Sequence, residues 1–152
     1  MLNHRRASVL LCLALLPGLL AGCTGGAPPT PTPRSVVNVL EGLALRGATI
    51  REAVSGDAGC SVAPLRGNAV RLALTLAGSP EQHELYLFRW RRPAQYDAAA
   101  ADFTDCVEEY AASAEGEVEV LELAPWRAFG RGWSDELAIV LEESLRAAGG
   151  AP

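Results

Sequence analysis

AVRLALTLA at residues 69–77 and ELYLFRW at residues 84–90 are two apolar segments separated by a short turn. In the first segment apolar and polar residues alternate: Val70, Leu72, Leu74 and Leu76 fall on one side, and Arg71 and Thr75 on the other. The second segment is apolar on both sides, with Leu85 and Leu87 on one and Tyr86, Phe88 and Trp90 on the other. A period of two residues is typical of β-strands. The two segments therefore predict a hairpin whose second strand is central and covered on both faces.

The rest of residues 35–149 predicts further strands and helices around this hairpin. Ser35 can cap a helix that ends at Gly47, and Ser134 can start a last helix with acidic residues in its first turn. The remaining elements are strands at 48–54 and 117–123, a glycine-rich loop at 56–68 and a helix at 96–112. The order α-β-β-β-α-β-α predicts a single α+β domain. We expect a two-layer sandwich in which helices cover a mainly antiparallel sheet of about four strands.

The N-terminal residues have the pattern of an export signal. Residues 1–6 carry two arginines and no acid, and an apolar run of about fourteen residues follows, which is short of the ~20 that a membrane-spanning helix needs. The run ends in Leu20-Ala21-Gly22-Cys23, which resembles the lipobox of bacterial lipoproteins. The resemblance covers residues 1–23. It implies cleavage after Gly22, a diacylglycerol group on the sulfur of Cys23, and further acylation of the new N-terminus with a chain such as palmitate.

The resemblance predicts a lipoprotein signal peptide at 1–22 and a lipidated cysteine at 23. Composition predicts that this cysteine begins a Gly/Pro/Thr tether at 23–34, followed by the domain at 35–149. Alternating Thr-Pro in the tether favours an extended conformation of about 3.1 Å per residue. The predicted location is the extracytoplasmic face of a cell membrane or envelope, with the membrane as a partner through the lipid. The alternative is an ordinary cleaved signal peptide with an incidental cysteine. The order of elements in the domain also resembles that of small uncharacterised bacterial lipoproteins, a likeness of pattern that implies no activity.

Cysteine usage agrees with export. Cys12 would leave with the signal peptide and Cys23 would take the lipid, so Cys60 and Cys106 remain in the domain. A remaining pair in an exported protein predicts a disulfide, which would stabilise the domain by roughly 4 kcal/mol and would be the main constraint on the 56–68 loop. A metal pair or a redox couple is the alternative. The spacing excludes a C-x-x-C motif and His83 has no obvious ligand neighbours, so no metal and no cofactor is expected.

WRAFGRGW at residues 126–133 is the most distinctive candidate site. It reads as an aromatic and arginine-rich loop before the last helix, and its candidate ligand-binding residues are Trp126, Arg127, Phe129, Arg131 and Trp133. The alternative is structural, with Trp133 against the first turn of the helix and the other two rings covering the sheet edge. A second candidate is an anion patch that combines this segment's arginines with Arg89, Arg91 and Arg92, although solvated ion pairs would explain those arginines equally.

Charge and motifs narrow the function classes. Loss of residues 1–22 removes Arg5 and Arg6 and no acid, so the formal net charge changes from −5 to −7. This balance argues against nucleic acid or anionic lipid headgroups as partners of the whole surface. No nucleophile-elbow motif is present, and no catalytic residues are expected. We expect a binding or interaction module of the cell envelope, whose partner is another envelope protein or a small extracytoplasmic ligand. A small hydrolase with an unrecognised site and an envelope scaffold without a discrete ligand remain open.

Overall fold

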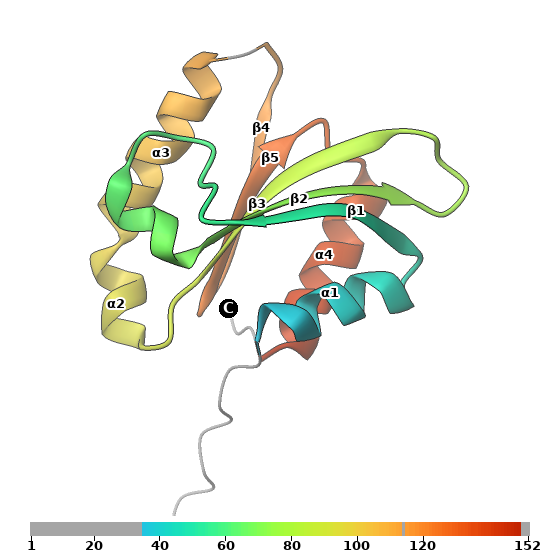
Figure 1. Ribbon diagram of the computed structural model, residues 1–152, viewed down its shortest axis with the longest axis horizontal. Coiled ribbons are helices and arrows are strands. Elements are labelled where there is room, and N and C mark those ends of the chain that lie inside the picture. The colour runs from blue at the N-terminus through green and yellow to red at the C-terminus, as the bar shows by residue number, and fades with distance from the viewer. Residues whose placement is uncertain (1–34, 114, 150–152) are drawn as a thin grey trace, which may run out of the picture. The chain divides into compact units, whose positions relative to one another are not determined.

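The computed structural model describes residues 35–113 and 115–149 (Figure 1). The predicted signal peptide, the predicted lipidation site Cys23 and the whole predicted tether at 23–34 lie outside these residues. Among the described helices, none has the length and apolar character needed to cross a membrane.

A five-stranded antiparallel sheet forms the centre of the domain. Its strands are β1 (Ala48–Ser55), β2 (Ala69–Leu76), β3 (Gln82–Arg89), β4 (Val118–Leu123) and β5 (Trp126–Arg131), in the spatial order β1-β2-β3-β5-β4. The α+β class and the antiparallel sheet are confirmed, and β2 and β3 form the predicted hairpin with β3 at the centre. The register of β1 on β2 shifts between Ile50 and Glu52, which marks a bulge in this edge strand.

The prediction of about four strands is wrong because residues 126–131 form a strand, not a loop. β5 pairs with β4 on one side and β3 on the other, and so occupies an inner position in the sheet. The helices are α1 (Val36–Leu45), α2 (Pro93–Ala98), α3 (Ala100–Ser113) and α4 (Asp135–Ala147), with a short 3₁₀ helix η1 (Ala63–Asn68). The helix predicted at 96–112 is therefore two helices separated at Ala99.

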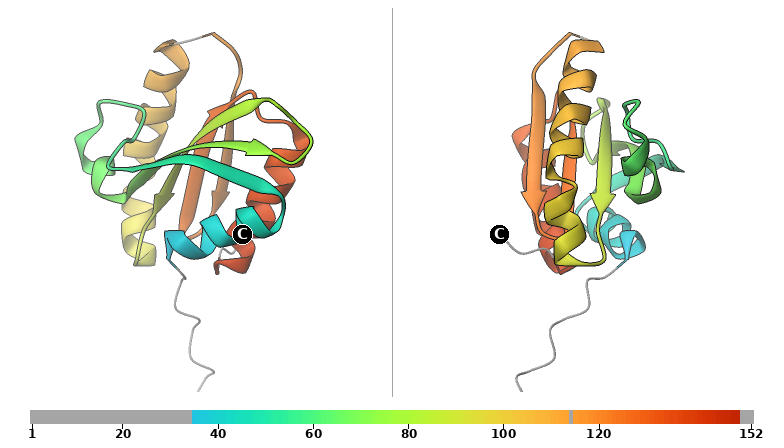
Figure 2. Two further views of the ribbon diagram at one scale, coloured as in Figure 1. Left: turned by 45° about the vertical axis from the view of Figure 1, so that its right-hand side comes forward. Right: turned by 90° about the vertical axis from the view of Figure 1, so that its left-hand side faces the viewer.

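Helices cover both faces of the sheet, so the domain has three layers and not the two that were expected. On one face, α1 and α4 pack on side chains that include Leu72, Leu85 and Trp126. On the other face, α2, α3 and η1 pack on an aromatic cluster that includes Phe88 and Phe129. Figures 1 and 2 show α2 and α3 on one side of the sheet and α1 and α4 on the other. Because the central strands are apolar on both sides, neither face can be left to solvent.

The predicted disulfide is present between Cys60 and Cys106, whose Cα atoms are 5.4 Å apart. Cys106 is buried on α3, in the same apolar cluster as Phe103. The bridge was expected to be the main constraint on the 56–68 loop, but other contacts also hold this loop. The backbone N–H and hydroxyl of Ser61 donate to the two carboxylate oxygens of Glu109 at 2.8 and 2.9 Å, and Leu65 is buried.

Candidate functional site

The residues of the predicted aromatic loop separate onto the two faces of the sheet because they belong to a strand. Trp126 is fully buried under α1 and α4, whereas Phe129 is fully buried in the aromatic cluster under α3. Arg127 and Arg131 lie on the same face as Phe129. The five candidate residues therefore do not line a common site, and Trp126 and Phe129 serve as core.

Arg127 is the most buried charged residue described, with 4% of its surface exposed. Its guanidinium carbon lies 4.0 Å from the ring centroid of Tyr96 and 5.2 Å from that of Phe103. Its Nε donates to a carboxylate oxygen of Glu122 at 2.7 Å. Stacking and pairing offset part of the desolvation of this cation, although its Nη1 has no hydrogen-bond partner among the described residues, and Arg127 packs as part of the aromatic core.

The predicted arginine patch does not form either. Arg131 lies over the ring of Tyr110 at 4.4 Å and donates to the backbone oxygen of Ala111. Arg89 is opposite Trp126 in the β3–β5 ladder, with its guanidinium over that ring on the α1/α4 face. The arginines of β3 and β5 therefore occupy opposite faces of the sheet.

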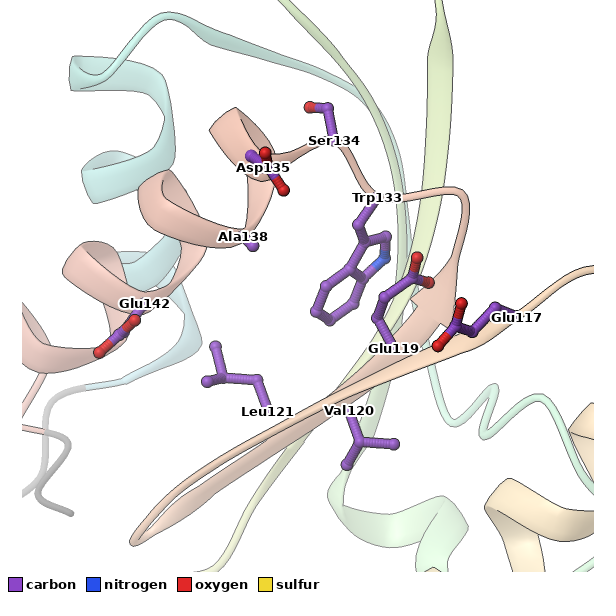
Figure 3. Close-up of a pocket in the computed structure, with 9 residues that line it drawn as sticks. All are labelled: Glu117, Glu119, Val120, Leu121, Trp133, Ser134, Asp135, Ala138 and Glu142. Atoms are coloured by element: carbon purple, nitrogen blue, oxygen red, sulfur yellow. The ribbon is translucent and has the colours of Figure 1, made fainter.

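A groove of about 350 Å³ lies between β4 and the start of α4 (Figure 3). Its lining combines an indole ring, small apolar side chains and carboxylates: Glu117, Glu119, Val120, Leu121, Trp133, Ser134, Asp135, Ala138 and Glu142. Of the predicted ligand-binding residues only Trp133 belongs to it. Trp133 is half-buried and follows β5, and Ser134 caps α4 by accepting from the backbone N–H of Leu137 at 3.2 Å.

Because Gly130 has no side chain, the indole of Trp133 can pack directly on the sheet. A Cβ at residue 130 would lie 2.4 Å from Nε1 of Trp133 and 2.5 Å from the backbone oxygen of Glu84. The indole therefore rests directly on the backbone of β5. Glu119 is opposite Gly130 in the β4–β5 ladder and lines the same groove. Gly130 thus leaves the space in which the indole N–H and the Glu119 carboxylate occupy one end of the groove (Figure 3).

Both of these polar groups are buried atoms without a hydrogen-bond partner among the described residues: Nε1 of Trp133 and Oε2 of Glu119. Buried polar atoms are normally paired, because an unpaired one costs about 1–3 kcal/mol. A donor and an acceptor at the same end of the groove therefore lack partners among the described residues.

The four carboxylates of the groove have different roles. Glu142 pairs with Arg146 one turn along α4, at 2.6 Å. Asp135 lies in the first turn of α4, where a negative charge stabilises the helix. Glu117 and Glu119 have no ion pair within residues 35–113 and 115–149. These two glutamates give the groove a negative charge that the fold does not use.

Other titratable groups occupy structural positions. His83 is 2% exposed, and its Nδ1 lies 3.1 Å from the backbone oxygen of Gly132, so Nδ1 is the donor. Burial raises the pKa of Tyr86, Tyr96 and Tyr110, and a hydrogen bond from the Tyr86 hydroxyl to Glu84 raises that pKa further. Among the described residues, no three His, Cys, Asp or Glu side chains are grouped so as to hold a metal ion.

No family model, curated protein or solved structure matches the chain. Glu117 and Glu119 were not among the ligand-binding residues predicted from the sequence. The available signal was their position: on a strand at 117–123 they share one face with Leu121, and this face packs on a helix that begins beside Trp133.

Proposed function

We propose that this chain is a lipid-anchored extracytoplasmic binding protein whose groove between β4 and α4 accepts a basic peptide segment of another envelope component. The observation that carries the proposal is the buried, unpartnered pair formed by the Trp133 indole N–H and the Glu119 carboxylate. Anchoring rests on the lipobox resemblance at residues 20–23.

The chemistry of the groove selects the ligand class. Glu117 and Glu119 attract a guanidinium or ammonium group, which forms short charge-assisted hydrogen bonds with a carboxylate. The ring of Trp133 adds a favourable interaction with a cation. The indole N–H is a donor and needs an acceptor, which a peptide carbonyl supplies. A basic side chain on a peptide backbone therefore satisfies both orphaned groups, whereas a simple metal ion would satisfy only the carboxylate.

Binding is tested on the purified lipidated protein in detergent micelles, with a blocked hexapeptide of alternating glycine and arginine as the probe. We expect saturable binding that weakens with salt. Glu119→Gln and Trp133→Phe should each weaken it about tenfold, because the first removes the negative charge and the second keeps a ring but removes the N–H. Glu108→Gln on the exposed side of α3 is the matched control. Equal affinity of all four proteins, or equal binding of a glycine-glutamate hexapeptide, would contradict the proposal.

Anchoring is tested separately. Cys23→Ala should release the protein from membranes or leave the precursor uncleaved, because two or more acyl chains are what hold a soluble domain stably on a bilayer. Membrane fractionation and intact mass measure both effects. An unchanged mass and unchanged fractionation would remove the lipoprotein part of the proposal and leave the groove untouched.

A further inference from the structure

A second pocket, of about 210 Å³, lies where α1 begins and η1 meets the end of β3. Three of its lining residues are arginines and none is acidic. The lining consists of Val36, Ser55, Gly56, Arg66, Gly67, Asn68, Ala69, Val70, Arg89 and Arg91. In a chain with more acidic than basic residues, an arginine-lined pocket without a carboxylate is unexpected. The local charge is thus opposite to that of the whole molecule.

Arg66 and Arg91 are exposed and form no salt bridge in the described part of the chain. This sets them apart from Arg46 and Arg71, which each pair with a carboxylate at 3.0 Å or less. Asp57 follows the lining residue Gly56, but its carboxylate is bound by Nε of Arg71 at 2.8 Å. Arg66 and Arg91 therefore give the pocket a positive charge, and their guanidinium groups can bind an oxyanion in bidentate fashion.

The arginine pocket and the acidic groove lie toward opposite ends of the β3–β5 ladder. The β3–β5 ladder runs from Arg89 opposite Trp126 to Glu84 opposite Arg131. Arg89 lines the arginine pocket, whereas Trp133, which follows Arg131, lines the acidic groove at the other end. Val36, the first residue of α1, also lines the arginine pocket, so the first described helix begins beside it.

We propose that Arg66 and Arg91, in this pocket, bind the phosphate groups of anionic lipid headgroups in the membrane to which the tether leads. This inference rests on the anchoring part of the proposed function. The overall negative charge repels the domain from an anionic surface, whereas the arginine-lined pocket is attracted to it. Headgroup binding orients the domain with the arginine pocket toward the lipid and the acidic groove away from it, where a soluble partner can reach the groove.

The test uses the full lipidated protein reconstituted into vesicles of phosphatidylglycerol or of phosphatidylcholine. Backbone hydrogen exchange is measured at residues 63–70 and 89–92. We expect protection at both segments in phosphatidylglycerol only, lost at high salt and lost in the Arg66→Gln/Arg91→Gln double variant. Arg51→Gln is the control, since Arg51 is also exposed but lies on β1 outside the pocket. Thermal unfolding of each variant verifies that the fold is retained.

The outcomes separate the possible sources of phosphate and the two proposals. Equal protection in both lipids, or protection unaffected by the double variant, overturns headgroup binding. Protection by glycerol phosphate in detergent to the same extent as by vesicles overturns the membrane as the ligand. If the purified protein carries no lipid, the anchoring proposal fails, and cosedimentation of that protein with the same vesicles tests the pocket alone. Each arginine removed should then lower the partition coefficient about fivefold.

Discussion

The Cys60→Ala/Cys106→Ala double variant tests how much of the domain's stability comes from its one described disulfide. The cysteines are 46 residues apart, and closing a loop of this size lowers the entropy of the unfolded chain enough to stabilise the fold by about 4 kcal/mol. Domains of this size have about 5–15 kcal/mol in total. We therefore expect chemical denaturation of the variant to report a loss of about 4 kcal/mol, and thermal unfolding a fall in Tm of roughly 15 °C.

The loop should stay docked even when the bridge is gone. Ser61 remains bound to both carboxylate oxygens of Glu109, and Leu65 remains buried. Trypsin digestion measures whether the loop stays docked, because Arg66 lies in the loop and is exposed. Cleavage after Arg66 under native conditions should change little in the double variant. It should rise about tenfold when Glu109→Ala is added, since hydrogen bonds to a charged group are worth about 1.5–3 kcal/mol.

Glu108→Ala in the same background is the matched control, because Glu108 is the exposed neighbour of Glu109 on α3 and has no contact with Ser61. Two results would refute the reasoning. A loss below about 1 kcal/mol in the double variant would mean that the bridge hardly constrains the unfolded chain. Rapid cleavage without the Glu109 substitution would mean that the hydrogen bonds do not hold the loop.

Substitutions at Gly130 and Arg127 and a rise in pH give three further predictions for the stability of the domain. Gly130→Ala should cost about 1–3 kcal/mol and shift the fluorescence of Trp133, because the new Cβ would lie 2.4 Å from its Nε1; unchanged fluorescence would contradict this packing. Arg127→Lys should cost about 2 kcal/mol in denaturant unfolding by losing its aromatic stacking, whereas Arg146→Lys on the exposed face of α4 should cost less than about 0.5; equal costs would argue against the aromatic contribution. Because burial raises the pKa of Tyr86 and the other tyrosines, the folded state keeps protons that the unfolded state loses near pH 10. Stability should therefore fall above about pH 10, with tyrosinate absorbance rising together with unfolding; early absorbance from folded protein would refute it.

Sequence patterns predicted those elements whose polarity follows their burial. The hairpin of β2 and β3 obeys this rule, and the cap at Ser134 was predicted from its residue type and position. β5 does not obey the rule, because Arg127 is buried as a stacked cation and Gly130 leaves room for an indole. A strand that contains arginine and glycine reads as a loop until its tertiary partners are known. The turn before it, at residues 124–125, has no glycine or asparagine to mark a hairpin.

The candidate site shows the same limit. Trp133 could be singled out as unusual, but its partner in the groove could not, since Glu119 reads as any acid on an exposed strand. Only the pairing of Glu119 with Gly130 places the carboxylate beside the indole. Likewise, Arg66 was not connected with Arg91, because the pocket joins a 3₁₀ helix to a segment more than twenty residues away.

The strand order also determines which edge strands two copies of the domain would present to each other. A sheet grows by adding strands at its edges, and the edges here are β1 and β4. The register shift between Ile50 and Glu52 interrupts the straight edge of β1, and Glu117 and Glu119 give the start of β4 a negative charge that a second β4 would repel. If acyl chains confine many copies to two dimensions, collisions between edges become frequent. Both edges then favour separation of the copies, so the protein can reach a high surface density without polymerising through its sheet.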